Sequence, residues 1–220
     1  MKVLLACNHT AALYNAIRAN GHQVLSCDLK PAQHSGNHYV GDVFDIINNG
    51  FDIMIAFPPC TYLCKAQEFR VQKDTERRKK QVSAACFVDQ LFNANISQIA
   101  IENPVGYLSR AWLQPSQIVR PWFFGDPYGK EICLWLKNTP PLISTLYNPV
   151  RKSISNHVNG RMCQARKSEI RSSWKYYPGL CKAIADQWCP PEKNSVSLGA
   201  RLLVYPISAL LTDQPQPPKS

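Results

Sequence analysis

The sequence predicts an α/β protein built on a doubly wound, mostly parallel sheet. Short apolar runs alternate with amphipathic segments in the order strand, helix, strand, which is typical of this class. Three of the apolar runs end directly at polar or proline-fixed residues, at Asp28, at Pro58-Pro59-Cys60 and at Glu102-Asn103-Pro104. In an open parallel sheet, groups at the carboxyl ends of strands line the ligand crevice.

The first 28 residues predict the opening half of a nucleotide-binding unit. Residues 2–7 are apolar and indicate a strand covered on both faces. Residues 11–20 predict a helix that stops at Gly21, and residues 23–28 predict a second strand ending in Asp28. An acid at this place can hold the hydroxyls of a ribose, or simply cap the strand end.

The middle of the chain continues the alternation. We expect a short strand and turn over 39–43, a short helix over 43–49 and a buried strand over 53–57, which Pro58-Pro59 terminates. Residues 75–93 predict an amphipathic helix, and residues 96–101 another buried strand. The apolar face expected for that helix consists of Val82, Ala85, Cys86, Val88, Leu91 and Phe92.

The remainder contains fewer clear elements. Residues 132–136 predict a strand, Pro178 opens a helix over 181–188, and residues 198–211 predict a final helix or strand. Residues 1–212 form a single domain in this interpretation, with a basic loop or small insertion over about 151–177. The Pro/Gln-rich tail 213–220 is expected to be disordered.

Composition excludes several classes of protein. The chain has 220 residues, of which 45% are hydrophobic, and contains no apolar run of the roughly 20 residues that a membrane helix needs. Its first residues predict a strand rather than a signal peptide. Nine cysteines without framework spacing suit a reducing compartment, so a cytoplasmic location is expected.

The net charge of +10 is concentrated in two segments. Residues 65–80 hold seven Lys/Arg against three acids, and residues 151–182 hold eight against one. Such segments favour a phosphate-bearing partner, although the first can also be a solvated helix face. The basic residues Arg77, Arg78, Lys79 and Lys80 oppose the dipole at their helix start, which favours an external partner.

Two strand-end loops predict a site. One presents the thiol of Cys60 and the other the carboxylate of Glu102, and their side chains can converge at one edge of the sheet. The alternatives are a buried structural thiol and an ordinary capped acid. Lys130, just before a strand, can face the same crevice or the solvent.

The order of these motifs resembles the catalytic core of the cytosine-C5 DNA methyltransferases. The resemblance is greatest to a short, phage-type group with a Pro-Pro-Cys-x-x-Leu-Cys box. It rests on Phe57-Pro-Pro-Cys60, on Ile101-Glu102-Asn103, on Asp28, on Gly41-Asp42 and on residues 177–188. It implies a class I, Rossmann-like methyltransferase fold, S-adenosylmethionine as cofactor, and DNA or a cytosine nucleotide as substrate.

The resemblance also implies roles for individual residues. Cys60 would be the nucleophile that adds to C6 of cytosine and Glu102 the partner of N3, with Pro59 and Asn103 completing the catalytic group. This chemistry needs a lowered Cys60 pKa, expected from a helix N-terminus at Thr61 and nearby cations. The implied cofactor residues are Cys7, Asn8, Asp28, Leu29, Asp42, Val43 and Phe57. The implied substrate contacts are Lys130, Arg171, Arg77, Arg78, Lys79 and Lys80.

Two alternatives remain open at this stage. The family's first loop is rich in glycine, whereas residues 7–11 here contain none, which favours a protein that binds nucleic acid or a nucleotide without methyl transfer. A zinc module is the other alternative, with His157, Cys163, Cys181 and Cys189 as ligands. No metal is expected in the leading interpretation. Cys64 is either a packing residue or a second thiol that takes part in the reaction.

The protein is expected to be a monomer or weak dimer, without a dedicated target-recognition domain, in the cytoplasm of a bacterial host if it is phage-encoded.

Overall fold

The computed structural model describes residues 1–146, 157–158, 161–162 and 177–192. Its centre is a seven-stranded sheet in the order β3-β2-β1-β4-β5-β7-β6. Neighbouring strands from β3 through β5 run parallel, while β7 is antiparallel to both β5 and β6. The expected doubly wound, mostly parallel, Rossmann-like sheet is therefore confirmed.

The strands of the sheet and the elements between them follow in chain order: β1 (Lys2–Ala6), α1 (Ala11–Ala19), β2 (Gln23–Asp28), β3 (His38–Val40), η1 (Val43–Asp45), β4 (Ile53–Ala56), η2 (Lys65–Gln67), α2 (Glu68–Gln72), α3 (Thr75–Phe92), β5 (Gln98–Pro104), α4 (Tyr107–Ala111), β6 (Gln117–Val119), η3 (Pro121–Phe124) and β7 (Ile132–Lys137). The two-residue strands β8 (His157–Val158) and β9 (Arg161–Met162) pair with each other, and α6 (Pro178–Trp188) follows.

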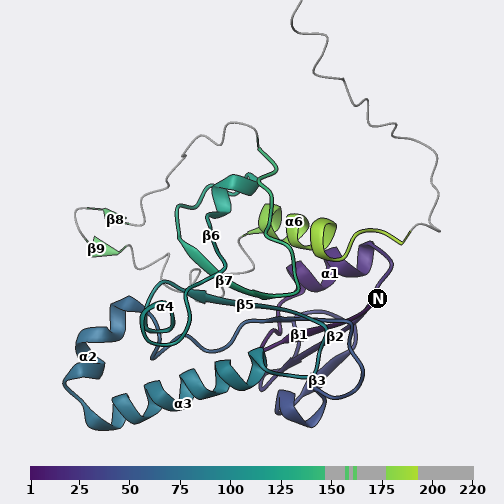
Figure 1. Cartoon of the computed structure of the whole chain (residues 1–220). Helices are drawn as coiled ribbons and strands as arrows, with labels where there is room; N and C mark the ends of the chain where they lie inside the picture. Colours follow the sequence, from purple (N-terminus) through teal and green to yellow (C-terminus); the bar gives the residue numbers. More distant parts are fainter. Residues whose placement is uncertain (147–156, 159–160, 163–176, 193–220) are drawn as a thin grey trace, which may run out of the picture.

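Helices cover both faces of the sheet, and successive residues of its central strands point to opposite faces. Alternate residues therefore belong to two separate cores. Val3 and Ile55 belong to a core shared with α1 and α6, whereas Leu4 and Met54 belong to a core shared with α3. Figure 1 shows α1 and α6 on one side of the sheet and α3 along the other.

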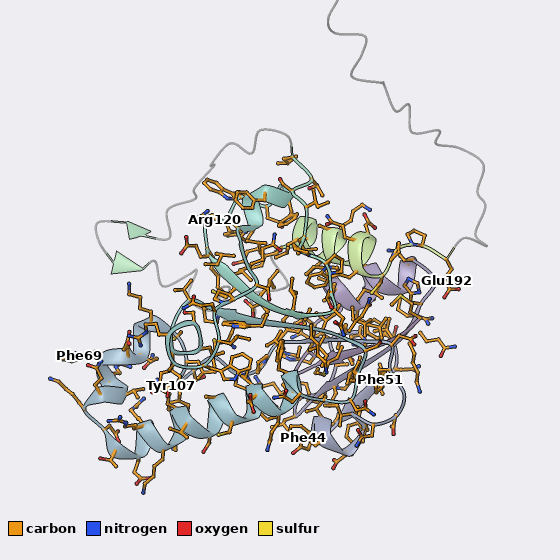
Figure 2. All side chains as sticks on the ribbon, viewed as in Figure 1. Phe44, Phe51, Phe69, Tyr107, Arg120 and Glu192 are labelled. Atoms are coloured by element: carbon orange, nitrogen blue, oxygen red, sulfur yellow. The ribbon has the colours of Figure 1, made fainter. Side chains whose placement is uncertain are left out.

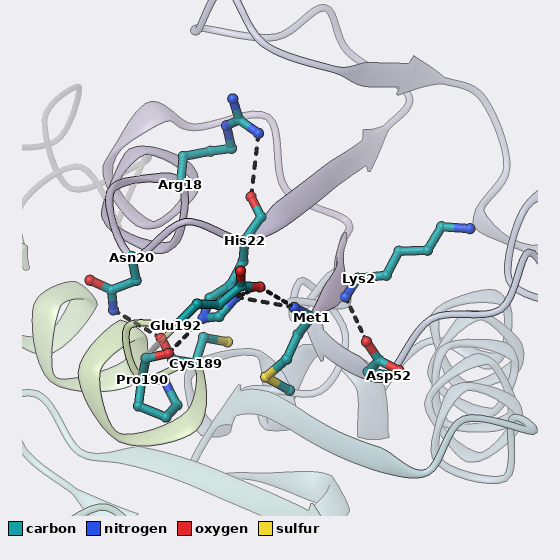
Figure 3. A network of polar contacts seen from close by, with 9 residues as sticks. All are labelled: Met1, Lys2, Arg18, Asn20, His22, Asp52, Cys189, Pro190 and Glu192. Carbon is teal, nitrogen blue, oxygen red and sulfur yellow. Dashed lines mark hydrogen bonds and ion pairs between the residues drawn. The ribbon is translucent and has the colours of Figure 1, made fainter. Parts of the chain in front are cut away.

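The start of β1, the end of α1 and the chain after α6 are tied together by polar contacts (Figure 3). Asn20 donates from Nδ2 to the Cys189 carbonyl at 2.9 Å. The buried His22 ring contacts the Pro190 carbonyl through Nε2 at 2.8 Å, and the Met1 amine contacts Glu192 at 3.0 Å. These contacts hold α6 against α1 at the amino edge of the sheet.

Several element predictions need correction. The strand predicted over 96–101 extends to Pro104, so Glu102 and Asn103 lie within β5 and not in a loop after it. The helix predicted over 43–49 is only a short 3-10 turn. On α3, the expected apolar face is partly wrong, since Val82 and Cys86 are exposed while Gln81 is buried. Gln81 faces the protein because its Nε2 donates to the Tyr62 carbonyl at 2.9 Å.

Some expectations lie outside the described residues. These are most of the basic segment 151–177 including Arg171, the predicted element 198–211, the tail 213–220, and with them the extent of the domain to residue 212. Within the described part of the chain, no helix is long and apolar enough to cross a membrane.

Candidate functional site

Cys60 and Glu102 lie at the same edge of the sheet. Strands β4 and β5 are parallel neighbours with Ala56 opposite Ile101, so the residues that follow these two positions emerge side by side. Cys60 is exposed in the loop after β4, while Glu102 is buried with 8% of its surface accessible. The predicted convergence of thiol and carboxylate thus follows from the register of two adjacent strands.

The two loops are held together by hydrogen bonds. Asn103 donates from Nδ2 to the Pro58 carbonyl at 3.0 Å, directly behind the cysteine. Further along, the Tyr107 N–H donates to the Leu63 carbonyl at 2.7 Å. The backbone of Gly106 pairs with Cys64 between these points, which gives Cys64 a place in the packing of the loops.

Gly106 is required at this contact because the backbones approach too closely for a side chain. A Cβ atom at Gly106 would lie 2.1 Å from the Leu63 carbonyl oxygen and 2.9 Å from the Lys65 nitrogen. Both are backbone atoms, so they cannot turn aside as a flexible side chain would. The cysteine loop and the loop after β5 therefore form one rigid unit.

The thiol of Cys60 is not activated in the resting protein. Desolvation raises its pKa above the ordinary value, and the negative charge of Glu102 raises it further, whereas Lys130 lowers it. The residue as a whole is exposed, yet the surrounding protein still desolvates its thiol in part. The expected lowering of the Cys60 pKa is wrong for this state.

The physical reason lies in the local backbone. Residues 61–64 form turns in which the Leu63 and Cys64 N–H groups donate to the Cys60 carbonyl at 3.0 and 3.1 Å. No helix begins at Thr61, since η2 starts at Lys65 and α2 at Glu68. The thiol therefore has no helix N-terminus to stabilise its anion.

Of the two positions expected for Lys130, facing the crevice or facing solvent, the structure shows the first. Its Nζ lies 3.7 Å from Glu102 Oε1, and its charge also acts on Cys60. The three groups thus form a coupled set of thiol, carboxylate and ammonium. Protonation of any one changes the proton affinity of the other two.

A cavity of about 400 Å³ reaches the cysteine loop. Five of the seven predicted cofactor residues line it, namely Cys7, Asp28, Leu29, Asp42 and Val43. Asn8 and Phe57 are not among its lining residues. Pro59 also lines it, so the cavity reaches the loop that carries Cys60.

Sequence reasoning missed one wall of this cavity. Ser83, Ala84 and Phe87 of α3 line it together with Cys27. Phe87 is half-buried and packs edge-on against Phe44 at 5.6 Å between ring centroids; Figure 2 shows Phe44 close to α3. Positions 83, 84 and 87 share one face of α3, and this spacing was the only signal in the sequence for a cavity wall. The same spacing is typical of residues that pack in a core, so it does not indicate a cavity by itself.

The first loop keeps a glycine-like backbone without a glycine. Cys7 has φ +55°, in the left-handed region that strongly favours glycine. Its thiol is desolvated and lies near Asp28, which together raise its pKa to about 12. The thiol therefore stays protonated at neutral pH and presents a neutral sulfur to the cavity.

Asn8 is fixed beside Cys7 but leaves a donor free. Its Oδ1 accepts from the Thr10 N–H at 2.7 Å and from the Thr10 hydroxyl at 2.9 Å. Its Nδ2 is buried without a hydrogen-bond partner among the described residues. An orphaned donor of this kind suits a polar group of a bound molecule.

The predicted basic contacts on α3 are engaged locally. Arg77 pairs with Asp74 at 3.3 Å, Lys79 pairs with Glu76 at 2.8 Å, and Lys80 lies 5.9 Å from the Tyr62 ring centroid. Arg78 lines a separate cavity of about 270 Å³ with Arg110 between α2, α3 and α4. These partners weaken the argument that the basic helix start requires an external ligand, and nucleic-acid contact here stays a prediction.

The zinc interpretation finds no support in the described residues. Among them, no group of three or more metal-ligating side chains lies together. Cys181 and Cys189 are buried in the core around α6, where desolvation raises both pKa values to about 12. Cys163 and the side chain of His157 lie outside the described part of the chain.

No protein-family model matches the chain, and no curated protein matches it either. Among solved structures, a methyltransferase of Entamoeba histolytica is similar over 72% of this chain and 61% of its own length, with 14% identity and a TM-score of 0.43. The chain thus spans less than two thirds of that protein. A similarity this weak identifies neither an activity nor a substrate.

Proposed function

We propose that this protein is a methyltransferase that acts on C5 of cytosine in DNA through a covalent bond from Cys60. The observation that carries the proposal is the placement of the Cys60 thiol, the Glu102 carboxylate and the Lys130 ammonium as one coupled set at the carboxyl edge of the sheet. Thiol addition to C6 needs a nucleophile on one edge of the pyrimidine and a proton source at N3 on another.

The cavity beside Pro59 suits S-adenosylmethionine. It is mostly apolar, with Phe87 and Val43 able to contact an adenine, and it carries Asp28 where a ribose diol would be held. When bound, the cofactor supplies an electrophilic methyl group.

The raised pKa of Cys60 defines how the thiol would be activated. Because the Glu102 charge opposes the thiolate, moving the Cys60 proton to Glu102 removes that opposition and yields a thiolate beside a neutral acid. The sulfur can then bond to C6, while Glu102 gives its proton to N3 as the ring electrons shift. C5 would then be electron-rich enough to accept the methyl group that the bound cofactor would supply. Loss of the C5 proton to a base, return of the N3 proton to Glu102 and departure of the Cys60 thiolate from C6 would restore the aromatic ring.

Lys130 would act through Glu102. Its ammonium, 3.7 Å from Oε1, offsets the negative charge that opposes thiolate formation. A base within a duplex must also be turned out of the stack to reach this edge. Action in the cytoplasm as a monomer or weak dimer completes the proposal.

The second candidate is a binding protein on the same fold that holds a nucleotide or nucleic acid without chemistry. Cys7 favours it, because a cysteine in the left-handed conformation places a side chain at a cavity where a glycine would leave space. The resting Cys60 thiol is compatible with it as well.

Two measurements test the proposal. Calorimetric titration with S-adenosylmethionine should show binding that Asp28→Ala weakens; no binding to the wild type would favour the second candidate. Incubation with cofactor and DNA containing 5-fluorocytosine should trap a covalent adduct, because fluorine cannot leave as the C5 proton does. Cys60→Ser should abolish this adduct and Cys64→Ser should retain it; an adduct in Cys60→Ser would refute the proposed nucleophile.

A further inference from the structure

A third cavity lies next to the catalytic set and has no role in the proposed reaction. It has a volume of about 670 Å³ and is lined by Arg120, Trp122, Lys130 and Glu131, with Pro104 and Val105 at its side. Lys130 is common to this cavity and to the set around Glu102. The cavity therefore adjoins the place where the pyrimidine would react.

The sheet topology explains this position. Strand β7 is antiparallel to both β5 and β6, so the carboxyl ends of β5 and β6 meet the amino end of β7 at one edge. Pro104 and Val119 both pair with Ile132 there. The cysteine loop follows the neighbouring β4 at this same edge.

The side chains in the cavity combine a flat aromatic surface with paired charges. Trp122 is half-buried and stacks on Phe123, with ring centroids 5.9 Å apart and planes inclined by 22°. The Arg120 guanidinium lies 6.0 Å from the Phe123 ring centroid and forms an ion pair with Glu131. Figure 2 shows Arg120 away from the side of the molecule where Phe69 and Tyr107 lie.

This charge balance argues against a simple phosphate site. Arg120 is paired with Glu131 and Lys130 with Glu102, so the positive charges at the cavity are compensated and it offers both donor and acceptor groups. An aromatic face beside an arginine and a carboxylate fits a nucleobase, whose ring stacks while its edge carries both donors and acceptors.

We infer that this cavity binds the base adjacent to the reacting cytosine in the same strand, with Trp122 stacking on it and the Arg120–Glu131 pair contacting its edge. The inference rests on the proposed function for the position of the cytosine. It makes Trp122 and the Arg120–Glu131 pair determinants of sequence preference, in a chain for which no recognition domain is expected.

The test uses single-stranded oligonucleotides with one cytosine and 2-aminopurine, a fluorescent base quenched by stacking, placed one or three positions from it. The full chain needs neither cofactor nor turnover in this assay. We expect quenching at one of the adjacent positions and not at the distant ones. Trp122→Ala should abolish the quenching and weaken binding about 10-fold, as loss of one base–aromatic stack does, whereas Trp122→Phe should keep most of it.

A second set of variants remains informative if Trp122→Ala does not fold. The protein should bind four oligonucleotides that differ only in the adjacent base with different affinities, and Arg120→Gln should reduce these differences. Lys2→Gln is the control, because it removes a positive charge at the amino edge of β1, far from this cavity. Equal loss in the control would assign the effect to overall charge and overturn the inference.

The failure of this inference differs from failure of the proposed function. Unchanged quenching in Trp122→Ala, together with a normal Cys60 adduct on fluorocytosine DNA, would overturn the base subsite and leave the methyltransferase proposal standing. Quenching that depends on Trp122 in a protein that forms no adduct would support the subsite and overturn the catalytic proposal.

Discussion

At the scale of single residues, the site is defined by groups that oppose each other's charge. Cys60 and Glu102 cannot both be ionised without cost, and Lys130 moderates that cost. Together with desolvation of the sulfur, the Glu102 charge raises the Cys60 pKa, so the thiol keeps its proton in the resting protein. The same charges that define the chemistry therefore also protect an exposed cysteine from unwanted reactions.

The substitution Glu102→Gln tests this coupling in the free protein. Because the Glu102 charge raises the Cys60 pKa, its removal should shift alkylation of Cys60 by iodoacetamide to lower pH. Lys130→Met removes a charge that lowers the pKa and should shift it to higher pH. Mass spectrometry of the Cys60 peptide against pH measures both, and profiles that coincide with the wild type would contradict the coupling.

The substitution Cys7→Gly tests the strain in the first loop. Relief of a left-handed non-glycine residue gains about 1–3 kcal/mol, and the extra freedom of glycine in the unfolded chain costs about 0.5–1 kcal/mol. We expect a small net stabilisation in denaturant unfolding and tighter binding of S-adenosylmethionine. Cys7→Ser keeps the Cβ atom and should change neither; an equal gain in both variants would exclude the steric explanation.

At the scale of elements, the close contact between the two site loops decides where the thiol lies. Neither loop is long, and each is anchored to a neighbouring strand, so a change at Gly106 reaches Cys60 through backbone atoms. Hydrogen bonds also fix the loop between β2 and β3. Asp28 Oδ1 accepts from the Lys30 N–H, and the His38 ring contacts the Lys30 carbonyl.

The substitution Gly106→Ala should destabilise the protein by about 2 kcal/mol, because a Cβ atom 2.1 Å from the Leu63 carbonyl forces the backbone apart. Adduct formation by Cys60 should fall as well. Denaturant unfolding measures the first effect. Gly129→Ala is the matched control at the same edge of the sheet, since nothing lies within 4 Å of a Cβ there; similar losses in both would contradict a specific contact.

A histidine relay predicts pH dependence in the β2–β3 region. The Gly36 N–H donates to His34 Nδ1, so His34 Nε2 carries the proton and donates to Ser26 Oγ at 3.0 Å. The Ser26 hydroxyl then donates to His38 Nδ1 at 2.7 Å, and His38 Nε2 donates to the Lys30 carbonyl at 2.8 Å. The His34 ring is neutral in this arrangement, because its Nδ1 accepts a hydrogen bond.

Burial lowers the pKa of His34, and the neighbouring His38 lowers it further. The unfolded chain therefore takes up the proton first, so this contribution to stability is complete above the ordinary histidine pKa of about 6.5 and is lost as the pH falls below it. The protection of β2 and β3 amides against hydrogen exchange, after correction for the intrinsic exchange rate at each pH, should fall as the pH is lowered from 7.5 to 5.5. His34→Gln should flatten this dependence; an unaltered pH profile would remove the relay from the explanation.

At the scale of the whole molecule, strand order brings two cavities and the coupled set of Cys60, Glu102 and Lys130 to one edge of the sheet. The cavity at Asp28 and Asp42, the coupled set around Glu102 and the cavity at Trp122 lie in succession along the carboxyl ends of β2, β1, β4, β5 and β6. Strand β7 runs antiparallel to β5, so its amino end lies at the carboxyl end of β5. Lys130, which directly precedes β7, therefore lies at the same edge as Glu102.

Local sequence predicted the strands β1, β2, β3, β4, β5 and β7 and the helices α1, α3 and α6, because apolar periodicity and proline stops are local properties, whereas the short strand β6 was not predicted. It also placed Cys60 and Glu102 at one edge, since adjacent parallel strands share that edge. Only the tertiary structure decided the Cys60 pKa, the α3 wall of the cavity at Asp28, the need for glycine at position 106 and the pairing of Arg120 with Glu131. Each of these depends on desolvation or on contact between segments distant in the chain, and neither has a signature in local sequence.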